Sequence, residues 1–312
     1  MSDSAKLSDA GPLLLSEARV QKLLHLHELL PVIEKALIEF SAGRVAQPLR
    51  SIVPVAAHEG WFGLMPAVYE DVFGAKLVTV FPKNAERGLH THLAAIHLFR
   101  AETGEPLAVM DGRFITAWRT AAVSALATRQ LSHPKARVLA ILGSGVQAHT
   151  HFEALRRQPP FEEVRVWSRT PEHARRFADE IGAAAMPVEQ AVRGADVIVT
   201  ATSASDPIVR GEWVKTGAYV NAVGSVGLRA RELDEELMKS AAVIVESRES
   251  ARHESAEIVQ SGAPIHAELG ELLGGTVRKP EAGTTVVFKS LGIAVEDIAA
   301  ARLVYQAALR DA

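Results

Sequence analysis

A short glycine-rich stretch in the middle of the chain has the spacing of a phosphate-binding turn. Residues 137–142 read as a buried strand, and Gly143 to Ala148 follow it directly. Gly143 allows a tight turn, Gly145 lets the backbone approach a pyrophosphate, and Ala148 lets the next helix pack closely. The free N–H groups at the start of that helix favour a negative ligand. We therefore predict dinucleotide binding, with cofactor contacts from Gly143, Ser144, Gly145, Val146 and Gln147.

The second strand of this unit, residues 164–167, ends in a basic sequence. An Asp or Glu at this place, about 20 residues after the turn, holds a ribose 2′-hydroxyl in NAD-binding proteins. Here Ser168, Arg169 and Thr170 stand there instead. A guanidinium and two hydroxyls suit a 2′-phosphate, so the predicted cofactor is NADPH (NADP+) rather than NADH. A solvated arginine is the simpler alternative. We also assign Thr202 and Val223, which end two later strands, to the cofactor.

Three cations ahead of the glycine turn could hold an anionic substrate: Arg50, Lys76 and Arg119. Arg119 is expected in the first turn of a helix that starts at Thr116, where a positive side chain is unfavourable. A bound carboxylate would relieve that cost. On the residues alone, an arginine that reaches solvent or pairs with an acid such as Asp111 is favoured. Arg50 and Lys76, each taken alone, are more typical of exposed strand residues.

Other kinds of chemistry have little support. The chain has no cysteine, which excludes disulfides and a thiol nucleophile. Its histidine pairs are two residues apart and do not share a helix face, so we predict no metal site. His92, and after it His58, could relay a proton, although structural roles are the alternative. No Gly-x-Ser-x-Gly motif supports a serine hydrolase.

Composition narrows the class of protein further. The net charge is −3 and 23% of residues are charged, so no broad basic surface indicates nucleic acid as a partner. No apolar run approaches the roughly 18 residues of a membrane span. The N-terminus lacks the basic start and apolar run of a signal peptide, so we expect a cytoplasmic protein without a membrane partner. Residues 1–10 are expected to be a loose tail.

The elements before the turn predict an α+β domain. A strand at Leu13–Leu15, a helix capped by Ser16 and a helix from Pro31 to Gly43 open the chain. Strands then follow one another without helices between them, which favours a mainly antiparallel sheet. Their expected ranges are 50–55, 61–66, 75–81, 93–100 and 106–111, with a hairpin turn at Glu102–Glu105.

The elements after Pro134, which ends the helix from Thr116 to Leu131, alternate between strand and helix. Strands are expected at 195–201, 218–223, 242–246 and 284–288. The alternation predicts an α/β fold with a Rossmann-type doubly wound parallel sheet. A final helix over 294–309 could return to the first domain. We therefore predict a substrate-binding and dimerisation domain at 1–131 plus 293–312 and an NADP-binding domain at 132–292.

Several motifs together make the sequence similar to the ornithine cyclodeaminase/mu-crystallin family, from about Leu13 to Tyr305. They are Met110–Gly112, Thr116–Ala122, Ile141–Ala148, Ala195–Ile198, Asn221–Gly224, Arg231–Asp234, Phe288–Gly292 and Val295–Asp297. The resemblance is closest to the mu-crystallin branch, whose activity is ketimine reduction. It implies that Arg50, Lys76 and Arg119 hold a substrate carboxylate, which reverses the preference stated above. It also implies a homodimer formed through the first domain's sheet, with the last helix returning to that domain.

Two departures from the family pattern weigh against cyclodeamination. Val226 stands where cyclodeaminases carry a catalytic Asp after Asn-Ala-Val-Gly, and Gly63-Leu64-Met65-Pro66 lacks their Glu before Met-Pro. Cyclodeaminases also favour NAD with an acid at the ribose, which Arg169 contradicts. The resemblance therefore implies net reduction.

The resulting hypothesis is an NADPH-dependent reductase that reduces the C=N bond of cyclic ketimine carboxylates to cyclic amino acids. We expect catalytic roles for Lys76, Arg119 and His92, and substrate contacts from Arg50, Lys76, Arg119, Trp61 and Leu291. The nearest alternative is an alanine dehydrogenase-like or N-alkyl amino acid dehydrogenase, which uses a keto acid and an amine. A non-catalytic crystallin-like protein that binds NADPH or thyroid hormone is the alternative from another class.

Overall fold

The chain forms two sheets, each in its own structural unit. The structure is a computed structural model that describes residues 11–156 and 161–311. By its contacts, unit 1 comprises Met1–His25, Val45–Thr116 and Ala294–Ala312, and unit 2 comprises Leu26–Arg44 and Ala117–Ile293. The expected loose tail at 1–10 lies outside the described residues.

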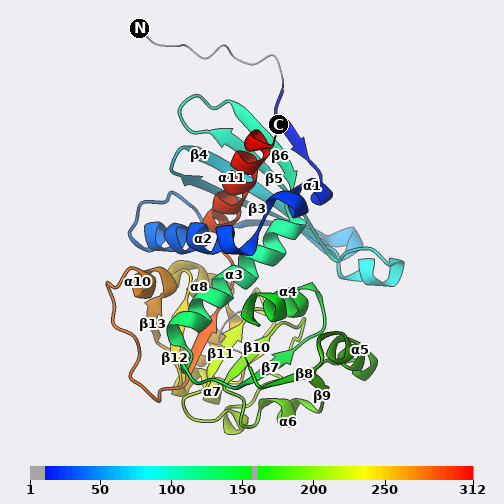
Figure 1. Ribbon diagram of the computed structural model, residues 1–312, viewed down its shortest axis with the longest axis vertical. Helices are drawn as coiled ribbons and strands as arrows, with labels where there is room; N and C mark the ends of the chain where they lie inside the picture. Colours follow the sequence, from blue (N-terminus) through cyan, green and yellow to red (C-terminus); the bar gives the residue numbers. More distant parts are fainter. Residues whose placement is uncertain (1–10, 157–160, 312) are drawn as a thin grey trace. The chain divides into compact units, whose positions relative to one another are not determined.

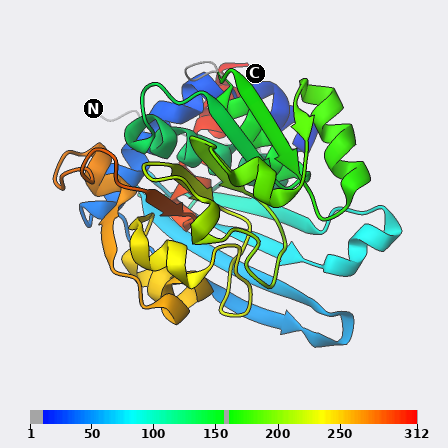
Figure 2. The ribbon, with the colours of Figure 1, turned by 90° about the horizontal axis from the view of Figure 1, so that it is seen from below.

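Unit 1 contains a six-stranded sheet in the order β1-β6-β5-β4-β3-β2. Strand β1 runs parallel to β6, and the other neighbours are antiparallel, as predicted. Gly104, at φ +75°, makes the β5–β6 hairpin turn possible. A 3₁₀ helix, η2 (Pro82–Arg87), links β4 to β5 and is cyan in Figure 2. The strands are β1 (Leu13–Leu15), β2 (Ser51–Val55), β3 (Gly60–Tyr69), β4 (Val72–Val80), β5 (His92–Arg100) and β6 (Pro106–Asp111).

The C-terminal helix α11 (Ala294–Arg310) packs on one face of this sheet, against β3, β4 and β5. Met65, Ala67 and Tyr69, at every second position of β3, are buried, while Leu64 and Val68, at the alternate positions, are exposed. Because side chains alternate across a strand, the second pair belongs to the opposite face of the sheet. The return of the last helix to the first sheet, which the sequence left open, is thus observed.

Unit 2 contains an eight-stranded parallel sheet in the order β13-β12-β14-β11-β10-β7-β8-β9. The predicted doubly wound fold is confirmed, and the chain reverses its direction across the sheet between β7 and β10 (Figure 1). Its strands are β7 (Val138–Leu142), β8 (Glu163–Trp167), β9 (Ala184–Ala185), β10 (Val197–Thr200), β11 (Tyr219–Ala222), β12 (Ala242–Val245), β13 (Ile265–Glu268) and β14 (Val286–Lys289).

Helices cover both faces of this sheet. Alternate strand residues such as Leu142, Ile198 and Val220 join a buried cluster with Leu237 and Met238 of α7. On the other face, Asn221 donates to Thr128 of α3, at 2.9 Å. The helices of unit 2 are α2 (Leu26–Ser41), α3 (Arg113–Leu131, shared with unit 1), α4 (Val146–Leu155), α5 (Pro171–Ile181), α6 (Val188–Val192), α7 (Glu235–Ser240), α8 (Arg248–Glu254), α9 (Ala256–Ser261) and α10 (Leu269–Leu273).

Two predicted helix starts are wrong. Helix α1 (Glu17–Leu23) is capped by Ser16 as predicted, but α2 begins at Leu26 and contains Pro31. A proline near a helix start removes only one hydrogen bond, because it lacks an N–H group. The apolar periodicity therefore continues on both sides of Pro31, and the helix starts before it. Helix α3 begins at Arg113 rather than Thr116, because the Asp111 carboxylate accepts hydrogen bonds from the N–H groups of Arg113 and Phe114.

The contact-based units differ from the predicted domains at α2 and α3. Both helices were expected in the first domain, whereas contacts group α2 and α3 from Ala117 onward with unit 2. Helix α10 packs on α2 so closely that a Cβ on Gly270 would lie 2.0 Å from the carbonyl oxygen of Leu37. The functional boundaries stay a prediction.

Candidate active site

The glycine turn has the backbone that a dinucleotide requires. Gly143 has φ +133°, and a Cβ there would lie 2.4 Å from the carbonyl oxygen of Ala201. Gly145 is the N-cap of α4, and a Cβ on it would meet nothing within 4 Å. Ala148 is fully buried against the sheet. The start of α4, which Val146 and Gln147 form, is therefore open to an anion and fits the pyrophosphate of a nicotinamide cofactor.

The ribose corner lies at the end of β8. The Ser144 and Ser168 hydroxyls are 2.9 Å apart, which ties this corner to the glycine turn. Arg169 is exposed, and it forms no ion pair with any residue that the structure describes. Thr170 is the N-cap residue of α5, although its side chain makes no cap hydrogen bond. The corner thus presents a cation and hydroxyls to solvent.

The loops that follow β10 and β11 are held by the buried carboxylate of Glu232. It accepts from the Thr202 N–H at 2.7 Å, the Thr202 hydroxyl at 2.8 Å and the Gly224 N–H at 2.8 Å. A Cβ on Gly224 would lie 2.3 Å from Thr202 backbone atoms. Val223, between β11 and this glycine, is buried. Thr202 and Val223 therefore lie at the carboxyl edge of the sheet, where ligands of such folds bind.

Lys76, in unit 1, is a buried cation. Its side chain is 2% exposed, and its ammonium lies 2.6 Å from the carboxylate of Asp297 in the first turn of α11. The β3–β4–β5 register places Lys76 between Met65 and Ile96, on the sheet face that α11 covers. The carboxylate offsets the cost of burying the ammonium and fixes its position. Lys76 is not the exposed strand residue that its local sequence favours.

Arg119, in unit 2, is also buried, with 5% of its surface exposed. Because α3 begins at Arg113, it lies in the second turn of the helix, so the predicted conflict with the helix dipole is weaker than expected. Its guanidinium rests against Gly292, where φ is +70° and a Cβ would lie 2.3 Å from a guanidinium nitrogen. A larger residue at 292 would displace the guanidinium.

The turn that carries Gly292 is fixed by a buried acid, Glu246, which follows β12. Its carboxylate accepts from the Ser290 hydroxyl, the Leu291 N–H at 2.9 Å and the Gly292 N–H at 3.2 Å. Leu291 itself is buried in the core cluster of unit 2. Its expected contact with substrate stays a prediction.

The other residues predicted to contact substrate or relay a proton belong to unit 1. Trp61, Gly63 and Met65 alternate along β3, and Met65 pairs with Lys76, so Trp61 lies on the same sheet face as Lys76. A Cβ on Gly63 would meet Val78 at 2.9 Å and Trp61 at 3.1 Å on this face. His92 lies on the same face and pairs with Val80 of β4. Because Val80 is four residues from Lys76, His92 is about 13 Å from Lys76 along the strand. Arg50 directly precedes β2, and His58 ends the 3₁₀ helix η1 (Ala56–His58). Their roles stay predictions.

The Glu before Met-Pro and the Asp after Asn-Ala-Val-Gly that cyclodeaminases carry have no counterpart in this chain. The packing around Gly63 leaves no room for a side chain on that face. Val226 is 41% exposed in the loop after β11. Neither Val226 nor the Gly63-Leu64 pair before Met65-Pro66 supplies a carboxylate.

Sequence reasoning missed the buried acids that support these groups: Asp297, Glu246 and Glu232. Asp297 and Glu232 lie within the family motifs Val295–Asp297 and Arg231–Asp234, and those motifs are the signal that could have identified them. Nothing in the local sequence distinguishes Glu246 from a surface acid.

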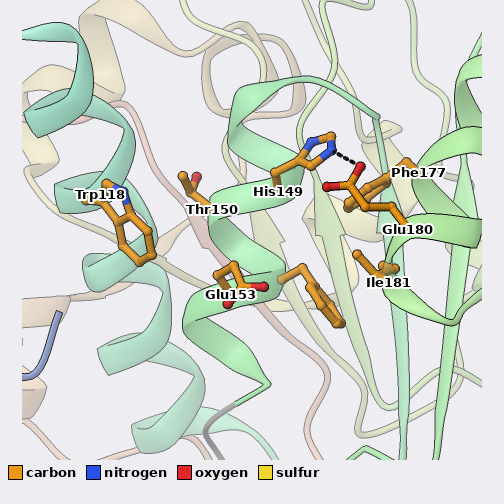
Figure 3. Close-up of a pocket in the computed structure, with 8 residues that line it drawn as sticks. Trp118, His149, Thr150, Glu153, Phe177, Glu180 and Ile181 are labelled. Atoms are coloured by element: carbon orange, nitrogen blue, oxygen red, sulfur yellow. Dashed lines mark hydrogen bonds and ion pairs between the residues drawn. The ribbon is translucent and has the colours of Figure 1, made fainter. Parts of the chain in front are cut away.

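A surface pocket of about 210 Å³ lies elsewhere in unit 2, between α3, α4 and α5 (Figure 3). Trp118, Phe152 and Phe177 contribute its apolar walls, and His149 lies 3.3 Å from Glu180 at its rim. None of the predicted site residues lines it.

The residues that the structure describes contain no group of three His, Asp or Glu side chains that could hold a metal ion. No helix among them is long and apolar enough to cross a bilayer. The cytoplasmic location stays a prediction.

Comparisons with known proteins agree with this geometry. The family model described as "Ornithine cyclodeaminase/mu-crystallin family" matches residues 11–312. The chain is 49% identical over 304 residues to the ketimine reductase mu-crystallin of Mus musculus, covering 95% of this chain and 97% of that protein. Thermococcus litoralis Δ1-pyrroline-2-carboxylate reductase, solved with NADH and L-proline, matches with a TM-score of 0.91 and 35% identity over 96% of this chain and 98% of that one. An archaeal alanine dehydrogenase dimer with bound NAD matches with a TM-score of 0.90 and 33% identity, over 96% and 97%. The chain belongs to the ornithine cyclodeaminase/mu-crystallin family.

Proposed function

We propose that this protein is an NADPH-dependent reductase of cyclic imines that carry a carboxylate. The observation that carries the proposal is that two buried cations have dedicated supports, Asp297 beside Lys76 and the Gly292 turn beside Arg119. Burying a cation is costly, and both places are nonetheless built to keep one in a fixed position. The named relatives, a ketimine reductase and a pyrroline-carboxylate reductase solved with L-proline, act on or bind molecules of this class.

In this proposal Arg50, Lys76 and Arg119 hold the substrate carboxylate, and the Gly143 turn holds the cofactor. The cofactor supplies a hydride from C4 of its dihydronicotinamide to the imine carbon. The protein orients the two reactants, which can supply much of the acceleration. The imine nitrogen gains one proton, either before hydride transfer or from a relay for which His92 is our first candidate. The product is the cyclic amino acid, and no carboxylate base is needed for this step.

Reduction is favoured over cyclodeamination by the two missing carboxylates. Cyclodeamination requires a base to direct water at an imine, and neither Val226 nor the Gly63-Leu64 pair before Met65-Pro66 carries a carboxylate. The site therefore suits hydride transfer without hydrolysis.

The preference for NADPH rests on Arg169. The Thermococcus reductase and the archaeal dehydrogenase were solved with NADH and NAD, respectively. Here an exposed guanidinium and the Ser168 and Thr170 hydroxyls stand at the ribose corner. They match a 2′-phosphate in charge and hydrogen bonding, and they supply no acceptor carboxylate for a 2′-hydroxyl.

A homodimer is the proposed assembly. Leu64 and Val68 are 37% and 46% exposed on the open face of the unit 1 sheet, where Phe73 and Phe99 also stack at 5.1 Å. An exposed apolar sheet face is typical of an interface. The alanine dehydrogenase relative is a dimer.

A substrate screen that follows NADPH absorbance tests the proposal. We expect consumption with preformed five- or six-membered cyclic imine carboxylates. Faster turnover of pyruvate with ammonia or methylamine would instead favour the amino acid dehydrogenase alternative. No turnover with either class, despite NADPH binding, would favour the non-catalytic binding protein.

A further inference from the structure

A lysine and a glutamate that are both fully buried meet at the carboxyl edge of the unit 2 sheet. Lys289 ends β14, Glu257 lies in α9, and their charged atoms are 3.2 Å apart. The Lys289 ammonium also donates to the carbonyl oxygen of Ser225 at 2.7 Å and to its hydroxyl at 2.9 Å. That hydroxyl in turn donates to Glu257 at 2.5 Å. The pair therefore fixes the backbone of the loop after β11.

A second buried acid connects this pair to the loop after β10. The N–H of Glu232 donates to Glu257 at 3.1 Å. The Glu232 carboxylate accepts from the hydroxyl of Thr200 at 2.7 Å, in addition to its bonds from Thr202 and Gly224. We call Glu232, Glu257, Lys289 and Ser225 the charged network. It holds two consecutive loops of the sheet edge in one arrangement.

The charged network is an inefficient way to gain stability. Burial raises the pKa of Glu257, but the charge of Lys289 and the hydrogen bonds from Ser225 and Glu232 outweigh it, so the pKa is lowered overall. Glu257 therefore stays ionised in the interior. Well-packed apolar residues often stabilise as much as a buried ion pair. A fully satisfied charged network does, however, restrict the chain to one conformation.

The strand order shows which part of a cofactor these loops would meet. A dinucleotide binds across the point where the strand order reverses, with one nucleotide over each half of the sheet. That point lies between β7 and β10. The adenosine half belongs over β7, β8 and β9, on the side of Arg169, and the nicotinamide half over β10 and β11. The charged network lies on the nicotinamide side.

We propose that Lys289, Glu257 and Glu232 are positioning residues, which hold the loops at Thr202 and Gly224–Ser225 in the shape that orients the nicotinamide half of the cofactor. This inference rests on the proposed use of NADPH. The network acts through the loop backbones and takes no part in hydride or proton transfer. Its loss should therefore weaken nicotinamide placement and leave recognition of the adenosine half intact.

Two variants of the network and one control test the proposal. Ser225→Ala removes only the hydroxyl that joins Lys289 to Glu257. Lys289→Met/Glu257→Gln removes both charges and keeps an acceptor for the Glu232 N–H. Asp196→Asn is the control, because Asp196 caps the opposite, amino edge of the same sheet, accepting from the N–H groups of Arg137 and Val138. The measurements are dissociation constants for NADPH and for 2′,5′-ADP, kcat with a cyclic imine, and Tm.

We expect both network variants to bind NADPH more weakly, or to turn over more slowly, by about tenfold or more, with 2′,5′-ADP affinity unchanged within about twofold. Asp196→Asn should lower Tm without either change. Wild-type NADPH affinity and kcat in Ser225→Ala would overturn the proposal, even if the double variant fails to fold. An equal loss of 2′,5′-ADP and NADPH affinity would also overturn it. Failure of the wild-type protein to bind NADPH would contradict the proposed cofactor instead.

Discussion

At the scale of single residues, the proposed preference for NADPH over NADH rests on Arg169. Arg169→Ala should raise KM for NADPH about tenfold or more, because one charge-assisted contact to the 2′-phosphate is lost. KM for NADH should change little. Steady-state kinetics with both cofactors measure this. Arg176→Ala, at an exposed position on α5, is the matched control and should affect neither. Equal effects of Arg169→Ala on both cofactors would refute the 2′-phosphate contact.

Gly292 offers a second test at this scale, because the Arg119 guanidinium packs directly against it. Gly292→Ala should lower kcat/KM for a carboxylate imine about tenfold to a hundredfold, because the added Cβ displaces the guanidinium. NADPH affinity should stay the same. Gly275→Ala is the control: it has the same φ of +70°, but its Cβ would meet nothing within 4 Å. If both variants lose activity equally, backbone strain rather than Arg119 is responsible.

At the scale of elements, a buried chain of hydrogen bonds connects α3 to α4, the helix that follows the glycine turn. The ring of His151 lies 2.8 Å from the Ser124 hydroxyl of α3 and 2.7 Å from the carbonyl oxygen of Gln147. The carbonyl can only accept, so Nδ1 carries the proton and Nε2 accepts from Ser124. Farther along α3, Thr128 donates to the Ser124 carbonyl and accepts from Asn221 of β11. Helix α3, which carries Arg119, is thereby fixed on the sheet.

His151 should make the stability of this unit depend on pH. Burial lowers its pKa to about 4, against a partly offsetting hydrogen bond to Gln147. The unfolded chain, with a histidine pKa of about 6.5, binds the proton first as the pH falls. Stability is therefore complete above about pH 6.5 and is lost toward pH 4, by about 2 kcal/mol at pH 5.

The measurement is Tm at pH 7 and at pH 5, where each kcal/mol corresponds to about 2–4 °C in a protein of this size. His151→Asn keeps an amide donor near Gln147 but does not titrate. We expect its Tm to fall less than that of the wild type between these pH values. An identical fall in both proteins would show that His151 contributes nothing to the acid sensitivity.

How much the sequence could predict also depends on the element. The glycine turn and the parallel sheet were predictable because glycine spacing and strand–helix alternation are local signals. The starts of α2 and α3 were not, since Pro31 and Thr116 resemble helix boundaries, while the Asp111 cap and the apolar face of α2 extend each helix. The support of Lys76 by Asp297, and of Gly292 by Glu246, joins distant parts of the chain. Such contacts leave no periodic pattern to detect.

At the scale of the whole molecule, the open sheet face of unit 1 predicts the oligomeric state. Leu64→Glu/Val68→Glu should convert the proposed dimer to a monomer, because it places four carboxylates at a symmetric apolar interface. Both side chains point away from the face that holds Lys76, so folding of unit 1 should be retained. Sedimentation velocity at micromolar concentration gives the mass. Val259→Glu, on an exposed apolar position of α9, is the control and should leave a dimer. A wild-type protein that sediments as a monomer would contradict the assembly, whereas a dimeric double variant would place the interface elsewhere.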